Sequence, residues 1–342
     1  MSDFDRRLLD AVQRAVPLVP RPYERLAAEL AAGAEEVIAR IAALARPGGI
    51  IREIAGVFDA AALGYASTLV AARCRPERLD EAGGIAASHP GVSHCYGRAG
   101  ELNLWFTLAV PPDSRLGLER TVELLGRRIG PERLLSLPAE RRYKLDVRFD
   151  MSGEPEAGSP GPTYSPASPA AAVRPGPGPG QIRAIRALQQ PLPAVREPFA
   201  ELAGPAGLSG DDLLVHAADF LSAGWMRRYS AVLRHRLAGA QANVLVAWNV
   251  PAERADSFAA HAAGFAGVSH CYLRAAPEGW PYNLYTMIHG RSDEEVDAVV
   301  AGIIAAAGDF PRAHFPTTHE YKKARLKLFS PELARWEAEA GA

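Results

Sequence analysis

Apolar residues in the first sixty positions recur at helical spacing in three short segments and then alternate in a fourth. Residues 3–13 place Phe4, Leu8, Leu9 and Val12 on one side, which predicts an amphipathic helix. A proline-broken connection follows, and the next expected elements are two helices and an alternating strand region, at residues 23–30, 34–45 and 50–58. Three short helices followed by a strand hairpin make a winged helix-turn-helix, which we predict for residues 1–60.

After position 60 the pattern changes to short strand-like runs separated by helical segments. The expected order is strand, helix, strand, strand, helix, strand, at residues 67–73, 76–88, 92–98, 102–110, 114–129 and 143–149. This β-α-β-β-α-β order is the ferredoxin-like motif, which we assign to residues 61–150.

The second half of the chain repeats the whole series. Its three helices and its wing are expected at residues 181–188, 198–203, 211–222 and 225–233. Its second β-α-β-β-α-β series is expected at residues 242–249, 252–263, 268–274, 282–289, 293–307 and 321–329. We therefore predict an α+β protein, a tandem repeat of a winged helix-turn-helix (residues 181–236 in the second copy) and a ferredoxin-like domain (237–330), with a tail at 331–342.

Residues 151–180 are predicted to be a linker between the halves. Fourteen of these thirty residues are Pro or Gly, so the segment cannot bury a core and is expected to be extended or disordered. A flexible chain of this length spans roughly 30 Å, which is enough for the two halves to dock side by side.

The clearest mark of duplication is the string Gly-Val-Ser-His-Cys-Tyr, which occurs at 91–96 and again at 267–272. Each copy is expected to be a strand, so side chains two apart share a face, about 7 Å from one another. In the second copy this puts Val268, His270, Tyr272 and Arg274 on one face and Ser269, Cys271 and Leu273 on the other.

We call the duplicated sets His94–Tyr96–Arg98 and His270–Tyr272–Arg274 the first and second polar rows. An imidazole, a phenol and a guanidinium in line suit an anionic, flat or aromatic partner. The alternative is that these are half-buried residues between two packed sheets.

Bulk composition excludes several classes of protein. The formal net charge is −1 and gives no general polyanion-binding signature. No apolar run approaches the roughly 18–20 residues that span a bilayer, and the first residues do not resemble a signal peptide. The three cysteines show neither metal-site spacing nor an even count for disulfides. We expect a soluble cytoplasmic protein.

A winged helix joined to a ferredoxin-like domain resembles the Lrp/AsnC family of transcription regulators, in which the third helix enters the DNA major groove. Such binding needs cations against the phosphates. The sequence has no Lys or Arg between Arg196 and Arg227, and Asp211, Asp212 and Asp219 lie on the presumed recognition helix. A ligand-responsive regulator therefore stays an alternative, but DNA is not an expected partner.

With both copies of the repeat considered, the chain resembles the siroheme decarboxylases, Lrp/AsnC-like proteins in which two subunits act together. Here the subunits look fused, as in the NirD–NirL type. The resemblance covers both halves and rests on the repeated string, on Glu101-Leu-Asn-Leu-Trp-Phe-Thr-Leu and Pro281-Tyr-Asn-Leu-Tyr-Thr-Met-Ile-His-Gly, and on Arg142-Tyr-Lys-Leu and His319-Glu-Tyr-Lys-Lys. It implies loss of CO2 from the acetate side chains at C12 and C18 of siroheme, with no cofactor beyond the substrate's iron.

This chemistry needs cations for the carboxylates of the macrocycle and an acid that supplies a proton where CO2 leaves. His94 and His270 are the candidates for the proton donor or for an axial ligand of the substrate iron. Tyr96 and Tyr272 are candidates for hydrogen bonding or proton relay, and Arg98 and Arg274 for gripping carboxylates.

Further candidates for substrate binding come with a structural alternative in each case. The arginines of the two wings could anchor carboxylates or lie in solvent, His289 could face the ligand or be an ordinary buried histidine, and the asparagines could orient a side chain or shape a hairpin. Tyrosine–lysine pairs in the last strands could bind substrate or guard a sheet edge. These residues are Arg52, Arg227, Arg228, His289, Asn103, Asn283, Tyr143, Lys144, Tyr321 and Lys322.

We expect the two ferredoxin-like domains to pair through their sheets as a pseudo-dimer, with siroheme as partner near the junction and no membrane. Further association of the chain stays open, as does a non-catalytic tetrapyrrole carrier as a third function.

Overall fold

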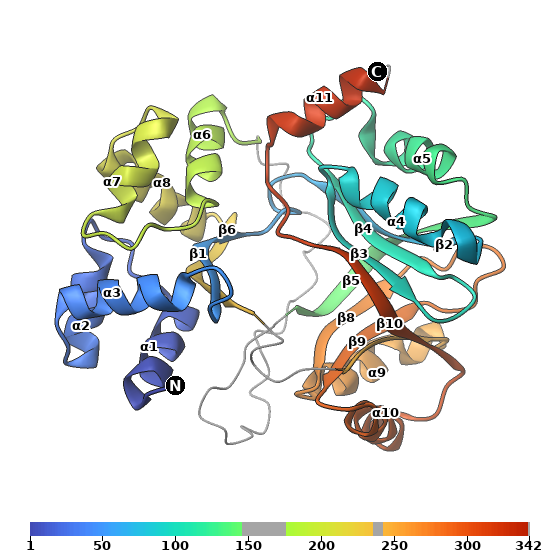
Figure 1. Ribbon diagram of the computed structural model, residues 1–342. Helices are drawn as coiled ribbons and strands as arrows, with labels where there is room; N and C mark the ends of the chain where they lie inside the picture. The colour runs from blue at the N-terminus through green and yellow to red at the C-terminus, as the bar shows by residue number, and fades with distance from the viewer. Residues whose placement is uncertain (146–175, 235–241, 341–342) are drawn as a thin grey trace.

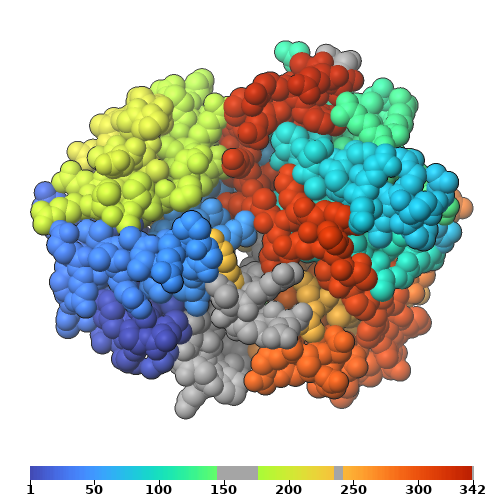
Figure 2. Space-filling view, in the orientation of Figure 1, coloured from blue at the N-terminus to red at the C-terminus, as the bar shows by residue number. Residues whose placement is uncertain are grey.

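A computed structural model describes residues 1–145, 176–234 and 242–340 of the chain. One lobe is mostly helical and the other is built around strands (Figure 1), and the space-filling view shows the two lobes side by side (Figure 2). Most of the predicted linker lies outside the described residues, and the helix that follows begins within its predicted range, at Pro179.

The helical lobe contains the helices expected from both halves. They are α1 (Asp3–Arg14), α2 (Pro22–Leu30) and α3 (Ala34–Ala45), then α6 (Pro179–Leu188), α7 (Pro198–Ala203) and α8 (Gly210–Ser222). Their apolar faces meet in one core, where Leu8, Leu9 and Val37 of the first half are buried with Phe199 and Phe220 of the second. The two sets of three helices therefore pack as one unit.

Each wing contains the expected strand, but neither half forms the expected hairpin. β1 (Ile51–Phe58) pairs antiparallel with β6 (Met226–Leu233), so the two halves share a two-stranded sheet. Periodicity predicts a strand without specifying its partner, and here the partner is the corresponding strand of the other half.

The second lobe has the predicted β-α-β-β-α-β order twice. The first series is β2 (Ala66–Arg73), α4 (Leu79–Ser88), β3 (Val92–Arg98), β4 (Leu104–Val110), α5 (Gly117–Ile129) and β5 (Arg133–Leu145). The second is β7 (Ala242–Trp248), α9 (Ala252–Gly264), β8 (Val268–Arg274), β9 (Leu284–Gly290), α10 (Asp293–Ala307) and β10 (Arg312–Lys323). The strands close into a barrel in the order β10-β3-β4-β2-β5-β8-β9-β7.

The last strand of each series closes this barrel by crossing to the other half. β5 pairs with β2 through its first part and with β8 through its second, and β10 pairs with β7 and then β3. The predicted bounds 143–149 and 321–329 were wrong, since the strands begin ten and nine residues earlier and β10 ends at Lys323. Pro138 and Pro316 conceal the early parts, because proline usually argues against a paired strand.

Apolar side chains fill the barrel on its inside and pack under helices on its outside. Trp105, Trp280, Tyr285 and Phe315 form the interior core. On the outside, the sheet of the first half packs under α4 and α5, and the sheet of the second under α9 and α10 (Figure 1). Side chains on β3 and β8 that do not face these helices must therefore point into the barrel.

The tail forms the helix α11 (Pro331–Glu339), which docks on the first half. Trp336 packs edge-to-face against His89, with ring centroids 4.2 Å apart, and Glu337 accepts a hydrogen bond from the Ser114 hydroxyl. Within residues 1–145, 176–234 and 242–340, no helix has the length and apolarity that crossing a membrane requires.

Candidate functional site

The two polar rows form contiguous ladders of side chains, as the sequence predicts. The ring centroids of His94 and Tyr96 lie 6.2 Å apart, and the guanidinium of Arg98 lies 5.2 Å from the Tyr96 ring. The second row repeats this, with 6.3 Å between the rings of His270 and Tyr272 and 4.7 Å between Arg274 and the Tyr272 ring.

Both rows point into the barrel. Residues directly opposite on paired strands share a face, and Tyr96 is paired with Trp105 and Tyr272 with Tyr285, both members of the interior core. On the other face, the buried thiol of Cys95 contacts helix α4. The rows therefore line the space between the two sheets.

Because of a β-bulge, the side chains at the start of each repeated strand face differently from the prediction. The register shifts between Val268 and His270, so Val268 packs with Cys271 on the helix side. Ser269, expected on the helix side, instead lies beside His270, with its Oγ 2.7 Å from His270 Nδ1. The first half shows the same shift, with Ser93 Oγ 3.0 Å from His94 Nδ1. A strict period of two cannot anticipate the extra residue of a bulge.

The arginines at the ends of the rows hold the main chain of the crossing strands. Arg98 donates to the carbonyl of Phe315 and to the Thr317 hydroxyl, and Arg274 donates to the carbonyl of Leu137. Both are buried, and burial lowers the pKa of Arg98 to about 10 and that of Arg274 below its usual range. In this structure the two guanidiniums therefore fix the crossing strands β10 and β5 against β3 and β8.

Cations surround the first row at the end of the barrel nearest the β1–β6 sheet. Lys323 is the strand partner of His94, and Arg52 of β1 donates to the carbonyl of Lys323 at 3.3 Å. Burial, together with Lys323 and Arg52, lowers the pKa of His94 to about 4. Burial raises the pKa of Tyr96 to about 12, so this phenol stays protonated at neutral pH.

The second row has a different set of neighbours. Arg142 of β5, the strand partner of Tyr272, and Arg227 of β6 both donate to Asp59, at 3.1 Å and 2.7 Å. Asp59 is 6% exposed, and although burial opposes ionisation, the two arginines hold its pKa below the ordinary value. Burial raises the pKa of Tyr272.

His289 belongs with the second row, as its position on the neighbouring strand suggested. Its Nε2 lies 2.8 Å from Ser269 Oγ, so one hydroxyl lies between two imidazoles. Burial, with Lys323 and Arg98 nearby, lowers the pKa of His289 to about 4.

The side chains of three predicted residues bond to groups outside the rows. The Asn103 side chain accepts from the main-chain N–H of Cys74 and donates to its carbonyl, and Asn283 does the same with Val250. This agrees with the alternative in which the asparagines shape the hairpins. Arg228 donates to the Ser230 hydroxyl on its own strand.

The tyrosine–lysine pairs of the crossing strands bind the helices of the opposite half. Tyr321 donates to Asp80 at the start of α4, and Lys322 donates to the carbonyls of Ala87 and His89 at its end. Tyr143 and Lys144 do the same to α9, through Asp256 and the carbonyl of Phe265. These pairs do not guard a sheet edge, because β5 and β10 are each paired on both sides in the closed barrel. Nor do they face the rows, because their side chains bind the helices outside the barrel.

Asp59, Ser93, Ser269 and Lys323 complete the surroundings of the rows, and sequence reasoning did not select them. Lys323 is the last residue of the segment His319-Glu-Tyr-Lys-Lys, which has no feature that marks this lysine as a neighbour of His94. The β-bulges turn Ser93 and Ser269 to a face that a period of two does not predict. Asp59 directly follows the strand predicted at residues 50–58, and no local sequence pattern indicates that it binds two distant arginines. Arg142 also lies beside the second row, where it shares Asp59 with Arg227.

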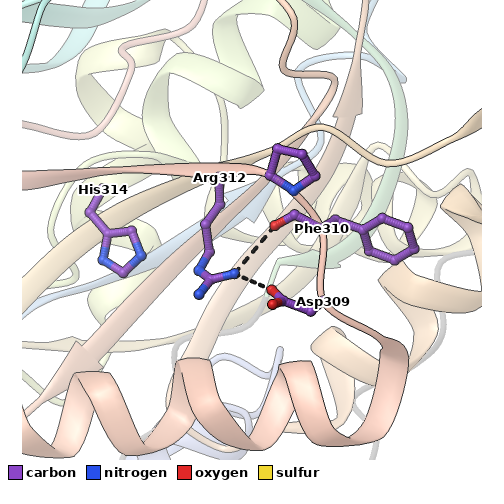
Figure 3. Close-up of a pocket in the computed structure, with 5 residues that line it drawn as sticks. Asp309, Phe310, Arg312 and His314 are labelled. Carbon is purple, nitrogen blue, oxygen red and sulfur yellow. Dashed lines mark hydrogen bonds and ion pairs between the residues drawn. The ribbon is translucent and has the colours of Figure 1, made fainter.

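One depression on the surface lies away from both rows. It is lined by Asp309, Phe310, Pro311, Arg312 and His314, and the Arg312 guanidinium in it bonds Asp309 and the Phe310 carbonyl (Figure 3). In the part of the chain that the structure describes, no group of three or more His, Cys, Asp and Glu side chains is placed to hold a metal ion.

Comparisons with known proteins agree with both lobes. A family model described as an AsnC-like ligand binding domain matches residues 62–144 and 237–322, and one described as a siroheme decarboxylase NirDL-like HTH domain matches residues 5–52. These matches cover both strand series of the barrel and the first set of three helices.

Named relatives match over the full length or over one half. The siroheme decarboxylase of Hydrogenobacter thermophilus is 35% identical over 338 residues, which cover 98% of this chain and 97% of that protein. In Desulfovibrio desulfuricans, a siroheme decarboxylase alpha subunit is 36% identical over 45% of this chain and 87% of its own length. The beta subunit from that organism is 33% identical over 44% of this chain and 96% of its own length.

Solved structures give the same result. The crystal structure of the siroheme decarboxylase NirDL has a TM-score of 0.77 and 32% identity to this chain, and covers 99% of it and 98% of its own chain. A second structure of that enzyme, in complex with an iron-uroporphyrin III analogue, matches equally well. With 35% identity along nearly its whole length to a named member, the chain belongs to the siroheme decarboxylase family.

Proposed function

We propose that this protein is a siroheme decarboxylase that removes CO2 from the C12 and C18 acetate side chains of siroheme and gives 12,18-didecarboxysiroheme, in heme d1 or alternative heme biosynthesis. The observation that carries this is the full-length similarity to a named siroheme decarboxylase, with both polar rows in place. We propose no cofactor beyond the iron of the substrate.

The charge around the rows suits a polycarboxylate. Arg52 and Lys323 lie beside the first row and Arg142 and Arg227 beside the second. A guanidinium pairs bidentately with a carboxylate, and Asp59 already occupies one carboxylate position between Arg142 and Arg227. We propose that the macrocycle binds at the end of the barrel nearest the β1–β6 sheet, where these cations lie.

The rows also suit proton delivery. Loss of CO2 from an acetate side chain leaves an electron pair on the remaining carbon. That carbon must take up a proton to become a methyl group. A neutral imidazole keeps one N–H that can be donated, and the substrate carboxylates that would gather here favour its protonated form. We assign this role to His94 and His270, with Tyr96 and Tyr272 as hydrogen-bond donors, and either histidine could instead ligate the substrate iron.

We also propose that each half derives from a winged helix-turn-helix and a ferredoxin-like domain. The alternative of a DNA-binding regulator is not favoured. Arg40 of α3 forms an ion pair with the buried Asp5, and Arg196 pairs with Glu35 at the start of that helix. The corresponding helix of the second half carries Asp211, Asp212 and Asp219 and no Lys or Arg, so it would repel phosphates.

Anaerobic incubation with siroheme, followed by the mass of the tetrapyrrole, tests the proposed function. Loss of two CO2 units is the expected result. A tetrapyrrole that binds and is recovered unchanged would instead indicate a carrier, and salt-sensitive binding to specific DNA would indicate a regulator.

A further inference from the structure

Asp59 is a buried carboxylate that holds two arginines of different strands beside the second row. Its Oδ2 accepts from Nη2 of Arg142 at 3.1 Å, and from Nε and Nη2 of Arg227 at 3.2 and 2.7 Å. Its Oδ1 accepts from the main-chain N–H groups of Ala61 and Ala62. Both oxygens are therefore engaged, and the main chain that follows β1 fixes the carboxylate in place.

We propose that Asp59 is a positioning residue for substrate binding: it holds one edge of the Arg227 guanidinium and thereby presents the opposite edge to a carboxylate of the macrocycle beside Tyr272. The inference rests on the proposed function. It adds to that function a residue that acts through an arginine and a place where one carboxylate of the substrate binds.

The guanidinium of Arg227 has two edges that can each bind a carboxylate. Its N–H groups lie in one plane, so the Nε–Nη2 edge and the Nη1–Nη2 edge each offer two parallel hydrogen bonds. Asp59 takes the Nε–Nη2 edge. Nη1 makes no hydrogen bond to a residue that the structure describes, and the side chain is 29% exposed. The edge that Asp59 leaves can therefore take a second carboxylate.

Tyr272 lies close to both arginines. Arg142 is its strand partner. Burial raises the pKa of Tyr272, and the positive charges of Arg142 and Arg227 act in the opposite direction, which requires both guanidiniums to be near the phenol. The phenol stays protonated at neutral pH and can donate a hydrogen bond. With two positive charges against the single negative charge of Asp59, this part of the barrel suits one further carboxylate.

The first row has a different arrangement at the same places. Arg52 and Arg227 are each the second residue of a wing strand, but β1 is followed by Asp59, whereas β6 is followed by an arginine. Glu320, and not an arginine, is the strand partner of Tyr96. An acidic side chain at that position repels a carboxylate, so the proposed subsite belongs to the second row.

Steady-state kinetics of CO2 release from siroheme by the full chain test the role of Asp59. Asp59→Asn keeps the oxygen that accepts from the main chain but places an amide NH2 group against two guanidiniums, so Arg227 loses its anchor. We expect KM to rise about 10-fold with kcat within about 2-fold, because binding of one carboxylate weakens while the reacting groups are unchanged. Arg227→Lys, which keeps the charge but has no second edge, should give the same result.

Two arginine backgrounds separate positioning from a merely structural role. In an Arg227→Ala background, Asp59→Asn should change KM by less than about 3-fold, because the side chain through which Asp59 acts is already gone. Arg52→Ala is the matched control, since Arg52 is the corresponding arginine of the other wing strand. In that background Asp59→Asn should keep its effect of about 10-fold on KM. A structural role would give the same factor in both backgrounds.

A parental KM in Asp59→Asn would overturn the positioning role, and so would a lower KM, which is the result expected if the substrate displaced Asp59 from the arginines. Equal effects of Asp59→Asn in the two arginine backgrounds would also overturn it. If Asp59→Asn does not fold, Arg227→Lys decides, since a parental KM in that variant is incompatible with a two-edged role. A parent protein that releases no CO2 from siroheme would refute the proposed function itself, whereas an active parent with unaffected variants would refute only the role of Asp59.

Discussion

At the scale of single residues, burial decides how each titratable side chain behaves. His94, His289 and His89 all have a pKa well below the ordinary value, chiefly because burial disfavours the charged ring. His94 and His289 are on the proposed binding surface, where a polyanionic ligand can compensate. His89 is fully buried under α11, where Trp336 packs against its ring.

His89 should therefore make the fold sensitive to acid. Its pKa is lowered to about 3 by burial and by Lys322 and Arg128, so the unfolded chain takes up a proton first as the pH falls below about 6.5. Stability should be fully present above that pH and should fall by about 2 kcal/mol per such histidine by pH 5.

The variant His89→Phe adopts the residue of the second half, since Phe265 stands at the equivalent position two residues before the repeated string. Urea unfolding at pH 7 and pH 5 should show a smaller loss of stability than in the parent. An unchanged difference between the two pH values would show that His89 does not contribute to acid sensitivity.

At the scale of elements, ion pairs and hydrogen bonds join strands and helices that are distant in the chain. Asp59, which follows β1, joins Arg142 of β5 and Arg227 of β6. It thereby connects the helical lobe to the barrel beside the second row. The arginine side chains are 16% and 29% exposed and that of Asp59 is 8% exposed, so this is a partly buried cluster and not a surface pair.

Asp59→Asn should destabilise the protein by about 2 kcal/mol at neutral pH, less than the cost of breaking a fully buried pair, because the arginines reach solvent. Asparagine keeps the Oδ1 that accepts from the main chain of Ala61 and Ala62, so the change isolates the charge. Asp309→Asn is the control, since Asp309 pairs with Arg312 on the surface and is 70% exposed. Equal urea midpoints for the two variants would contradict the role given to Asp59.

At the scale of the whole molecule, each half is completed by strands of the other. β1 pairs with β6, β5 crosses to β8 and β10 crosses to β3. Tyr321 and Lys322 bind α4 of the first half, and Tyr143 and Lys144 bind α9 of the second. The expected pseudo-dimer therefore forms by exchange of strands and not by the mere stacking of two finished sheets.

Two fragments, residues 1–150 and 176–342, should assemble when they are produced together. Co-expression should give a 1:1 complex by size-exclusion chromatography with mass measurement, because the strand exchange needs no covalent link. Either fragment alone should aggregate, since the ends of β5 or β10 would expose unpaired strand edges. Folded monomeric fragments would contradict this account.

The sequence alone determined the duplication, the class and order of nearly all elements, and the contents of the two polar rows. These are local properties, because periodicity and repeated strings can be read within one segment. Only the tertiary structure decided which strands pair, that β1 joins β6, that the last strands cross between halves, and that Arg98 and Arg274 bind main chain.

The same holds for the candidate site. Local pattern identified His94, His270 and His289, whereas the bulge that turns Ser269 toward two imidazoles and the meeting of Asp59 with two arginines depend on residues far apart in the chain. No spacing within one segment reports such contacts, because they arise only when the two halves close on each other.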